Sequence, residues 1–139
     1  MANAVDETGE VTLHLPCDTR SVRASRRAVE LVLRARGWRD TDIQWAQLAV
    51  AELVANAVVH AHSDMTVRIR IDGWVLLEVS DRDAHAHVAP REVEPDTIGG
   101  RGLQLVERVS RRWGVARGTA GKTVWCEVEP HEAAYQNTG

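Results

Sequence analysis

The chain has 139 residues, 44% of them hydrophobic, which is enough for one compact domain with a buried core. Its formal net charge of −3 argues against a nucleic-acid-binding protein, because such proteins carry a strongly basic face. No apolar run reaches the ~18 residues that a membrane helix needs, and residues 1–7 lack the pattern of a secretion signal. We therefore expect a single cytoplasmic domain over residues 1–139, with no direct nucleic-acid or membrane partner.

The N-terminal part of the chain predicts an edge strand followed by a helix. Residues 11–15 alternate between apolar and polar side chains, as a half-buried strand does. Asp18 or Thr19 can then cap a helix that runs to about Arg36, where Gly37 supplies the stop.

The middle of the chain predicts a second helix and a β-hairpin. Residues 66–71 alternate with a period of two, Asp72-Gly73 is a two-residue turn signal, and residues 74–80 form the return strand. The helix before them, capped by Asp40 or Thr41, keeps these apolar residues on its buried side: Ile43, Ala46, Val50, Leu53, Val54, Ala57 and Val58.

The C-terminal part predicts a loop, a third helix and a second hairpin. Residues 82–98 contain two prolines and show no period, as is typical of a surface loop. Apolar residues recur at helical spacing over residues 103–112, and residues 113–116 and 123–128 form two strands around a turn.

This order of elements predicts a two-layer α+β sandwich. Hairpins pair neighbouring strands antiparallel, so we expect a mixed, mostly antiparallel sheet with the helices on one face. The first ten residues and the last nine show no apolar pattern, so we expect an ordered core of about residues 11–129 between loose termini.

Three polar residues interrupt the apolar second half of the second helix. Glu52, Asn56 and His60 stand four residues apart, so they form one stripe on the helix surface. Buried polar groups without partners cost a few kcal/mol, so such a stripe needs something to bind. Because carboxylate and amide oxygens coordinate magnesium or its waters, the stripe suits a magnesium–phosphate site.

A glycine-rich segment, Gly99-Gly100-Arg101-Gly102-Leu103, runs directly into the third helix. Its glycines allow close approach to the backbone, and the free N–H groups and dipole of the helix start attract an anion such as phosphate. The alternative is a flexible linker that leads into a helix, and the glycines alone favour that alternative, because short glycine motifs are common.

A second glycine segment, residues 116–123, matches a relaxed P-loop pattern with alanine in place of the first glycine. A P-loop needs a strand before it and a helix after it, whereas Val124, Cys126 and Val128 alternate as a strand does. We therefore reject the P-loop and expect Gly121-Lys122 to form a hairpin turn.

Two further features could bind a ligand. Asp81 stands at the end of a predicted strand, where it either forms a turn or accepts a hydrogen bond from an exocyclic amine such as that of adenine. The pairs His60/His62 and His85/His87 suggest a metal site, but no clear third and fourth ligands accompany them, so zinc is the less favoured interpretation.

Four arginines, Arg20, Arg23, Arg26 and Arg27, make the first helix basic. A solvated face is the default interpretation of such a run, and docking of an acidic partner protein is the alternative. Charge reversal at Arg23 and Arg27 distinguishes the two, because only docking depends on them.

With these motifs placed, the chain resembles the GHKL (Bergerat-fold) ATP-binding family, and more closely its small bacterial branch of anti-sigma-factor serine/threonine kinases. The segment from Glu52 to Ala61 is similar to the N-box, and Asp81 stands where the adenine-binding aspartate is expected. Gly99-Gly100-Arg101-Gly102-Leu103 is similar to the phosphate-loop glycine box, and Gly121-Lys122-Thr123-Val124-Trp125 resembles the terminal strand signature of that branch. The resemblance covers roughly residues 13–128.

The resemblance implies a role for each matching residue. Asn56 would hold the magnesium ion that bridges the phosphates of ATP, and Glu52 would orient or deprotonate the attacking hydroxyl. Asp81 would accept a hydrogen bond from the adenine amino group, supported by Thr123 directly or through water. Residues 82–98 would form a lid over the nucleotide. The turn and helix start around the phosphates would come from Gly100, Arg101, Gly102 and Leu103.

The function implied by the resemblance is a kinase that sequesters a sigma factor and phosphorylates an anti-anti-sigma antagonist, in a branch where homodimers are common. Two departures from the family pattern point to an alternative. Asp83 stands where the family usually has glycine, and the lid, which contains His85 and His87, is short. Because these departures would narrow the pocket and limit closure, the alternative is a non-catalytic, nucleotide-responsive regulator that binds a protein partner.

Overall fold

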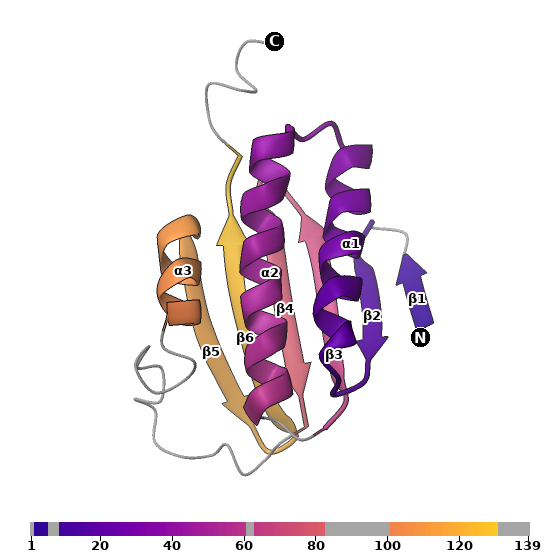
Figure 1. Cartoon of the computed structure of the whole chain (residues 1–139), viewed down its shortest axis with the longest axis vertical. Coiled ribbons are helices and arrows are strands. Elements are labelled where there is room, and N and C mark those ends of the chain that lie inside the picture. The colour runs from indigo at the N-terminus through magenta and orange to yellow at the C-terminus, as the bar shows by residue number, and fades with distance from the viewer. Residues whose placement is uncertain (1, 6–8, 61–62, 83–100, 131–139) are drawn as a thin grey trace.

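The computed structural model describes residues 2–5, 9–60, 63–82 and 101–130, which form two layers (Figure 1). Three helices cover one face of a sheet: α1 (Arg20–Ala35), α2 (Asp40–His60) and α3 (Arg101–Val109). The sheet has six strands: β1 (Ala2–Val5), β2 (Val11–Leu15), β3 (Met65–Ile71), β4 (Val75–Asp81), β5 (Arg112–Gly118) and β6 (Gly121–Val128). Their order is β1-β2-β3-β4-β6-β5, and each neighbouring pair is antiparallel. The predicted two-layer α+β sandwich is confirmed, with an antiparallel rather than a mixed sheet over the described strands.

The first residues of the chain correct the prediction of a loose N-terminus. Residues 2–5 form the edge strand β1, in which Ala2 lies opposite His14 of β2. Four residues are too few for an alternating pattern to be recognised. The strand forms because the edge of β2 supplies hydrogen-bond partners for its backbone. Residues 131–139, the other predicted loose end, lie outside the described residues.

Local hydrogen bonds define both ends of α1. At its start, the Asp18 carboxylate accepts the backbone N–H of the first helical residue at 2.7 Å, as predicted for a cap. At its end, Gly37 has a φ of 81° and donates its N–H to the Arg34 carbonyl at 3.1 Å, while Trp38 donates to Leu33 at 3.0 Å. This pattern is a Schellman motif, so the predicted stop at Gly37 is confirmed.

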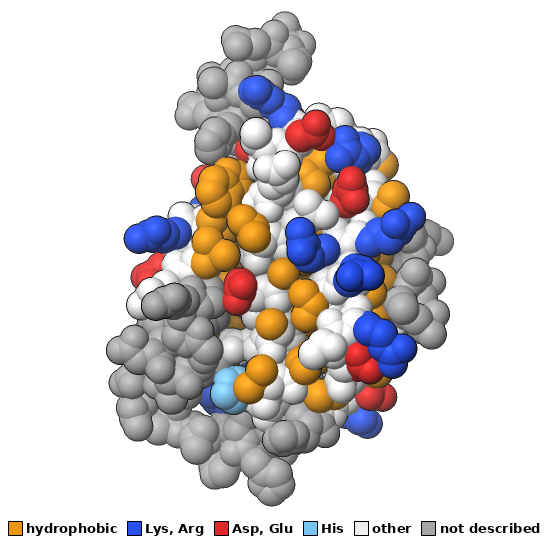
Figure 2. Space-filling model, viewed as in Figure 1, with side chains coloured by type: hydrophobic (Ala, Val, Ile, Leu, Met, Phe, Trp, Pro, Cys, Tyr) orange, Lys and Arg blue, Asp and Glu red, His pale blue; other side chains and the backbone are white. Residues whose placement is uncertain are grey.

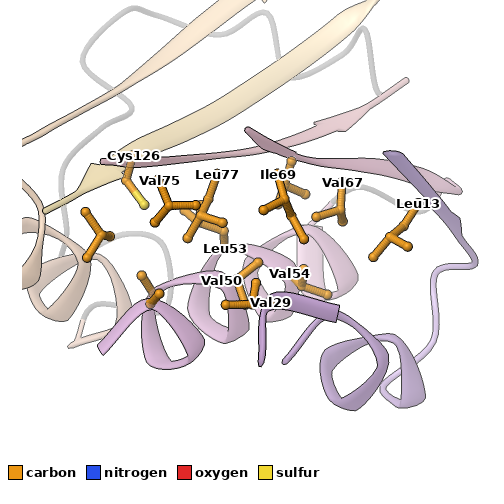
Figure 3. Packing of buried hydrophobic residues seen from close by; sticks show 14 of the residues in the cluster. Leu13, Val29, Val50, Leu53, Val54, Val67, Ile69, Val75, Leu77 and Cys126 are labelled. Carbon is orange, nitrogen blue, oxygen red and sulfur yellow. The ribbon is translucent and has the colours of Figure 1, made fainter. Parts of the chain in front are cut away.

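The hydrophobic core lies between the helices and the sheet (Figure 3). The central helix α2 packs against both α1 and α3, and its Val50 and Leu53 lie across from Ile69 and Leu77 of the sheet (Figure 3). Every residue that we predicted on the buried side of α2 is buried except Val58, which is half-buried.

The first hairpin differs from its prediction in loop length. Ile71 pairs with Val75, so residues 72–74 form a three-residue loop instead of a two-residue turn. Gly73 has a φ of 81°, so the glycine still occupies a left-handed position that other residues rarely adopt.

The second hairpin also corrects the prediction. Gly118 pairs with Gly121, so the turn consists of residues 119–120, and Lys122 belongs to β6 rather than to a turn. Strands precede and follow this turn, so the rejection of a P-loop is confirmed.

The third helix begins and ends earlier than predicted. It spans Arg101–Val109, because Arg111 already donates its backbone N–H to the Glu127 carbonyl at 2.8 Å and the following residue pairs within the sheet. In the part of the chain that the structure describes, no helix is long and apolar enough to cross a membrane.

Candidate functional site

A cleft of about 980 Å³ opens at the lower end of the molecule in Figure 1, where β2, β4 and β5 end and β3 and β6 begin. The last turn of α2 lies at this same end, and α3 begins partway up the molecule with its first turn facing that end (Figure 1). Residues from both faces of the sheet line the cleft, and among them are Asp81, Lys122 and Thr123. Among the described residues, the cleft is lined by strand ends and the segments beside them, and by no residue of a helix.

Asp81 is the last residue of β4, as predicted, and only 6% of its surface is exposed. Alternate residues of β4 are buried under the helices, and Asp81 continues that alternation, so it belongs to the helix-facing side. A carboxylate at the buried edge of a cleft can accept a hydrogen bond from an amino group such as that of a purine base.

The structure places Thr123 and Asp81 on opposite faces of the sheet. The Thr123 hydroxyl lies 2.7 Å from the Ser80 hydroxyl, its cross-strand partner on the face that carries no helices. Lys122 is the β6 residue paired with Asp81, and Arg117 of β5 is paired with Lys122. A row of one carboxylate and two cations thus crosses three strands on the helix-facing side.

Neither Lys122 nor Arg117 is among the site residues predicted from the sequence. The signal was present, because Lys122 continues the alternation of Val124, Cys126 and Val128, all of which are buried. Extending that pattern by one step would have placed Lys122 on the same face of β6 as the core residues.

Gly121 allows β4 and β6 to approach each other closely beside Asp81. Its φ is 142°, and a Cβ atom there would collide with the Asp81 carbonyl oxygen and lie 2.8 Å from the Arg82 Cα. This glycine therefore determines the path of the backbone that carries the buried carboxylate.

Glu52, Asn56 and His60 form the predicted stripe on α2, and all three are half-buried. Gln47 marks the flank of α2 next to α1, because its Nε2 donates to the Arg26 carbonyl of α1 at 3.1 Å. Asn56 follows Gln47 by nine residues, about two and a half turns. The stripe therefore lies on the opposite flank of α2, toward α3 (Figure 1).

The stripe occupies the second half of α2 and is not part of the cleft. Glu52 and Asn56 do not line the cleft, and neither side chain has a hydrogen-bond partner within the described ranges. The Glu52 and Asn56 side chains both carry oxygen atoms and lie one turn apart. Because neither bonds to a described residue, the pair fits a hydrated magnesium ion. The described residues contain no group of three or more His, Cys, Asp or Glu that could hold a metal by themselves.

The structure describes the glycine-rich segment only from Arg101 onward. Gly99 and Gly100 lie outside the described residues, as do residues 83–98 with Asp83, His85 and His87. Arg101 begins α3, followed by Gly102 and Leu103. The helix therefore begins before the predicted residue 103, and its N-terminus faces the end of the molecule where the cleft opens (Figure 1).

Comparison with known proteins gives a family match and two similar folds. A family model described as a histidine kinase-like ATPase domain matches residues 15–127. The crystal structure of the RsbU and RsbW domains of Rv1364c from Mycobacterium tuberculosis is similar with a TM-score of 0.67 and 22% identity over 87% of this chain. This chain spans only 32% of that one.

A second solved structure is the histidine kinase domain of a blue-light activated histidine kinase from Erythrobacter litoralis EL346. Its TM-score is 0.50 at 20% identity, covering 99% of this chain and 68% of that one. No curated protein sequence matches the chain. At these identities the two structures show a shared fold.

Proposed function

Because the chain belongs to the histidine kinase-like ATPase family, we propose that it is a serine/threonine protein kinase of the anti-sigma-factor type. Family membership makes it a kinase-like ATP-binding domain with the GHKL fold. The proposal adds the phosphorylated amino acid and the partners. It is carried by one observation: the buried Asp81 and the last turn of α2 lie at the same end of the molecule, and the N-terminus of α3 faces that end.

In this proposal the nucleotide lies between the strand ends and the helices. Asp81 accepts a hydrogen bond from the adenine amino group. Thr123 lies on the other face of the sheet but lines the same cleft, so it would support this contact through water. The phosphates lie at the start of α3, where the free N–H groups and the helix dipole favour negative charge. Lys122 and Arg117 add positive charge beside the cleft, which attracts a polyphosphate. The segment of Gly100, Arg101, Gly102 and Leu103 surrounds the phosphates.

Asn56 would hold Mg²⁺ through its side-chain oxygen. A single amide ligand leaves most of the coordination shell to water and phosphate oxygens, which is how Mg²⁺ is usually bound beside a nucleotide. When bound, the ion neutralises negative charge on the phosphates during transfer.

Glu52 would act on the attacking hydroxyl. It precedes Asn56 by one helical turn, so the two side chains are neighbours on α2. Its carboxylate accepts the proton of a serine or threonine hydroxyl as that oxygen bonds to the γ-phosphorus and the bond to ADP breaks.

The proposed partners are an anti-anti-sigma protein, which is phosphorylated, and a sigma factor, which is sequestered, both in the cytoplasm. A homodimer is part of the same proposal. The support is the set of four motifs in the order of the family, together with a fold shared with a structure whose description includes an RsbW domain.

Calorimetric titration with Mg·ATP tests the proposal in matched variants. We expect Asn56→Ala to weaken binding by at least about tenfold, or about 1.4 kcal/mol, because it removes the metal ligand. Glu52→Ala should bind Mg·ATP within about threefold of the native affinity but lose transfer of radiolabelled phosphate to the antagonist by about 100-fold. Gln44→Ala, an exposed change on the same helix, is the control and should alter neither.

Two outcomes would redirect the interpretation. A native chain that does not bind Mg·ATP would contradict the proposed site. Binding without phosphate transfer to any candidate antagonist would favour the non-catalytic regulator that Asp83 and the short lid suggest.

A further inference from the structure

A groove of about 500 Å³ lies on the outer surface of the helical layer, between α1 and α2. It shares no lining residue with the cleft at the strand ends. Its lining is Thr19, Val22, Arg23, Arg26, Arg27, Glu30 and Gln47. We propose that this groove docks an acidic, amphipathic helix of a partner protein, and this docking does not depend on nucleotide binding.

The first observation is the pairing of the arginines on α1. Arg20 forms an ion pair with Asp18 at 2.8 Å, and Arg34 forms ion pairs with Glu30 at 3.2 Å and Asp40 at 2.8 Å. These two arginines are therefore neutralised within the chain, and Arg34 also compensates the only acidic residue in the groove lining.

The groove arginines themselves differ from these two. Arg23, Arg26 and Arg27 are exposed and form no ion pair with any residue that the structure describes. The chain as a whole carries a net charge of −3, so the groove is a local positive patch on an acidic protein. Guanidinium groups bind carboxylates through paired hydrogen bonds, which favours a partner rich in Asp and Glu.

The second observation is the apolar surface beside these charges. Val22 is half-buried in the groove. Leu31 is 58% exposed one helical turn after Arg27, and Leu48 is 38% exposed next to Gln47. Figure 2 shows hydrophobic side chains between the basic ones on this face. A partner that offered only carboxylates would leave this apolar surface exposed. An amphipathic acidic helix covers the apolar surface and also pairs with the groove arginines.

The groove is also fixed before any partner binds. Gln47 Nε2 donates to the Arg26 carbonyl at 3.1 Å, which ties α2 to α1 through two residues of the groove lining. The Schellman motif at Gly37 fixes the connection between the same two helices. A preformed groove lowers the ordering cost of docking.

The test uses a fluorescein-labelled helical peptide of about 20 residues, with Leu along one face and Glu on the others. Fluorescence anisotropy measures its binding to the full chain, to Arg23→Glu/Arg27→Glu and to Arg70→Glu/Arg108→Glu. The last pair consists of exposed arginines outside the groove, and it changes the net charge equally. A scrambled peptide of the same composition, a DNA 20-mer and vesicles with phosphatidylglycerol are the comparison ligands.

We expect the groove variant to lose about tenfold in peptide affinity, or more, and the control variant to stay within about twofold. The scrambled peptide should bind at least about tenfold more weakly than the amphipathic one. Equal loss in both variants, equal binding of the scrambled peptide, or tighter binding of DNA or vesicles through the same arginines would overturn the proposal. Mg·ATP titration of the same variants should match the native chain, which separates failure of this groove from failure of the nucleotide site.

Discussion

At the scale of single residues, Gly121 controls the backbone next to the buried Asp81. We expect Gly121→Ala to lower the free energy of unfolding by about 1–3 kcal/mol, because its Cβ collides with the Asp81 carbonyl at a φ of 142°. Urea denaturation measures this loss. Because the collision displaces the end of β4, Mg·ATP affinity should fall as well, as calorimetry would show.

Gly118 offers a matched control in the same hairpin. It pairs with Gly121, yet a Cβ built on it meets nothing within 4 Å and its φ is not in the left-handed region. Gly118→Ala should therefore change neither stability nor nucleotide affinity appreciably. If the two substitutions behave alike, close approach at Gly121 does not position Asp81.

The same residues show what the sequence could predict about the site. Asp81 was predictable because a carboxylate directly after an alternating run marks a strand end, and the structure has it there. The assignment of Thr123 rested on a motif alone, and cross-strand register was needed to show that Lys122 is opposite Asp81. Register depends on pairing between distant segments, which local pattern does not contain.

At the scale of elements, the Schellman motif at the end of α1 leads to a prediction about stability. Gly37 has a φ of 81° and a Cβ there would meet nothing within 4 Å, so a substitution costs backbone strain without a steric clash. We expect Gly37→Ala to lower the free energy of unfolding by about 1 kcal/mol in urea denaturation. Gly37→Asn should lose less, because asparagine tolerates the left-handed conformation better. Equal losses of stability in the two variants would contradict the view that Gly37 stabilises the chain by adopting the left-handed conformation of the Schellman motif.

Elements with strong local signals were predictable, and elements defined by pairing were not. The helices α1 and α2 carry caps and apolar periodicity, so their existence and buried faces followed from the sequence. The strand β1 and the boundary between α3 and β5 differ from prediction, because both depend on hydrogen bonds to β2 and β6. Residues predicted at the end of a helix can join a strand instead, because hydrogen bonds to the neighbouring strand then satisfy their backbone groups.

At the scale of the whole molecule, one layer of helices on one face of a sheet divides the surface into separate regions. The cleft opens where the strands end, near the last turn of α2, while the α1–α2 groove lies on the outer side of the helical layer. The two regions share no lining residue, so the proposed nucleotide site and the proposed docking groove use different residues.

The same layering buries a thiol at the interface of helices and sheet. Cys126 on β6 is 0% exposed, and this burial is the largest of the influences that raise the pKa of its thiol from about 9 to about 12. Because the pKa is raised in the folded state, the stabilisation is fully present below about pH 9 and is lost as the pH rises toward 12. Within this window only the unfolded chain releases the proton.

We therefore expect the native chain to lose up to about 1.4 kcal/mol of stability per pH unit above pH 9 through this group alone. Urea denaturation from pH 7.5 to 10.5 should show the difference between the native chain and Cys126→Ala shrinking as the pH rises, because alanine cannot ionise. Cys17→Ala removes the half-buried thiol and retains Cys126, so its pH dependence should follow the native chain. A constant difference between native and Cys126→Ala would show that Cys126 ionises as readily in the folded chain as in the unfolded one, and that the helix–sheet interface admits water at β6.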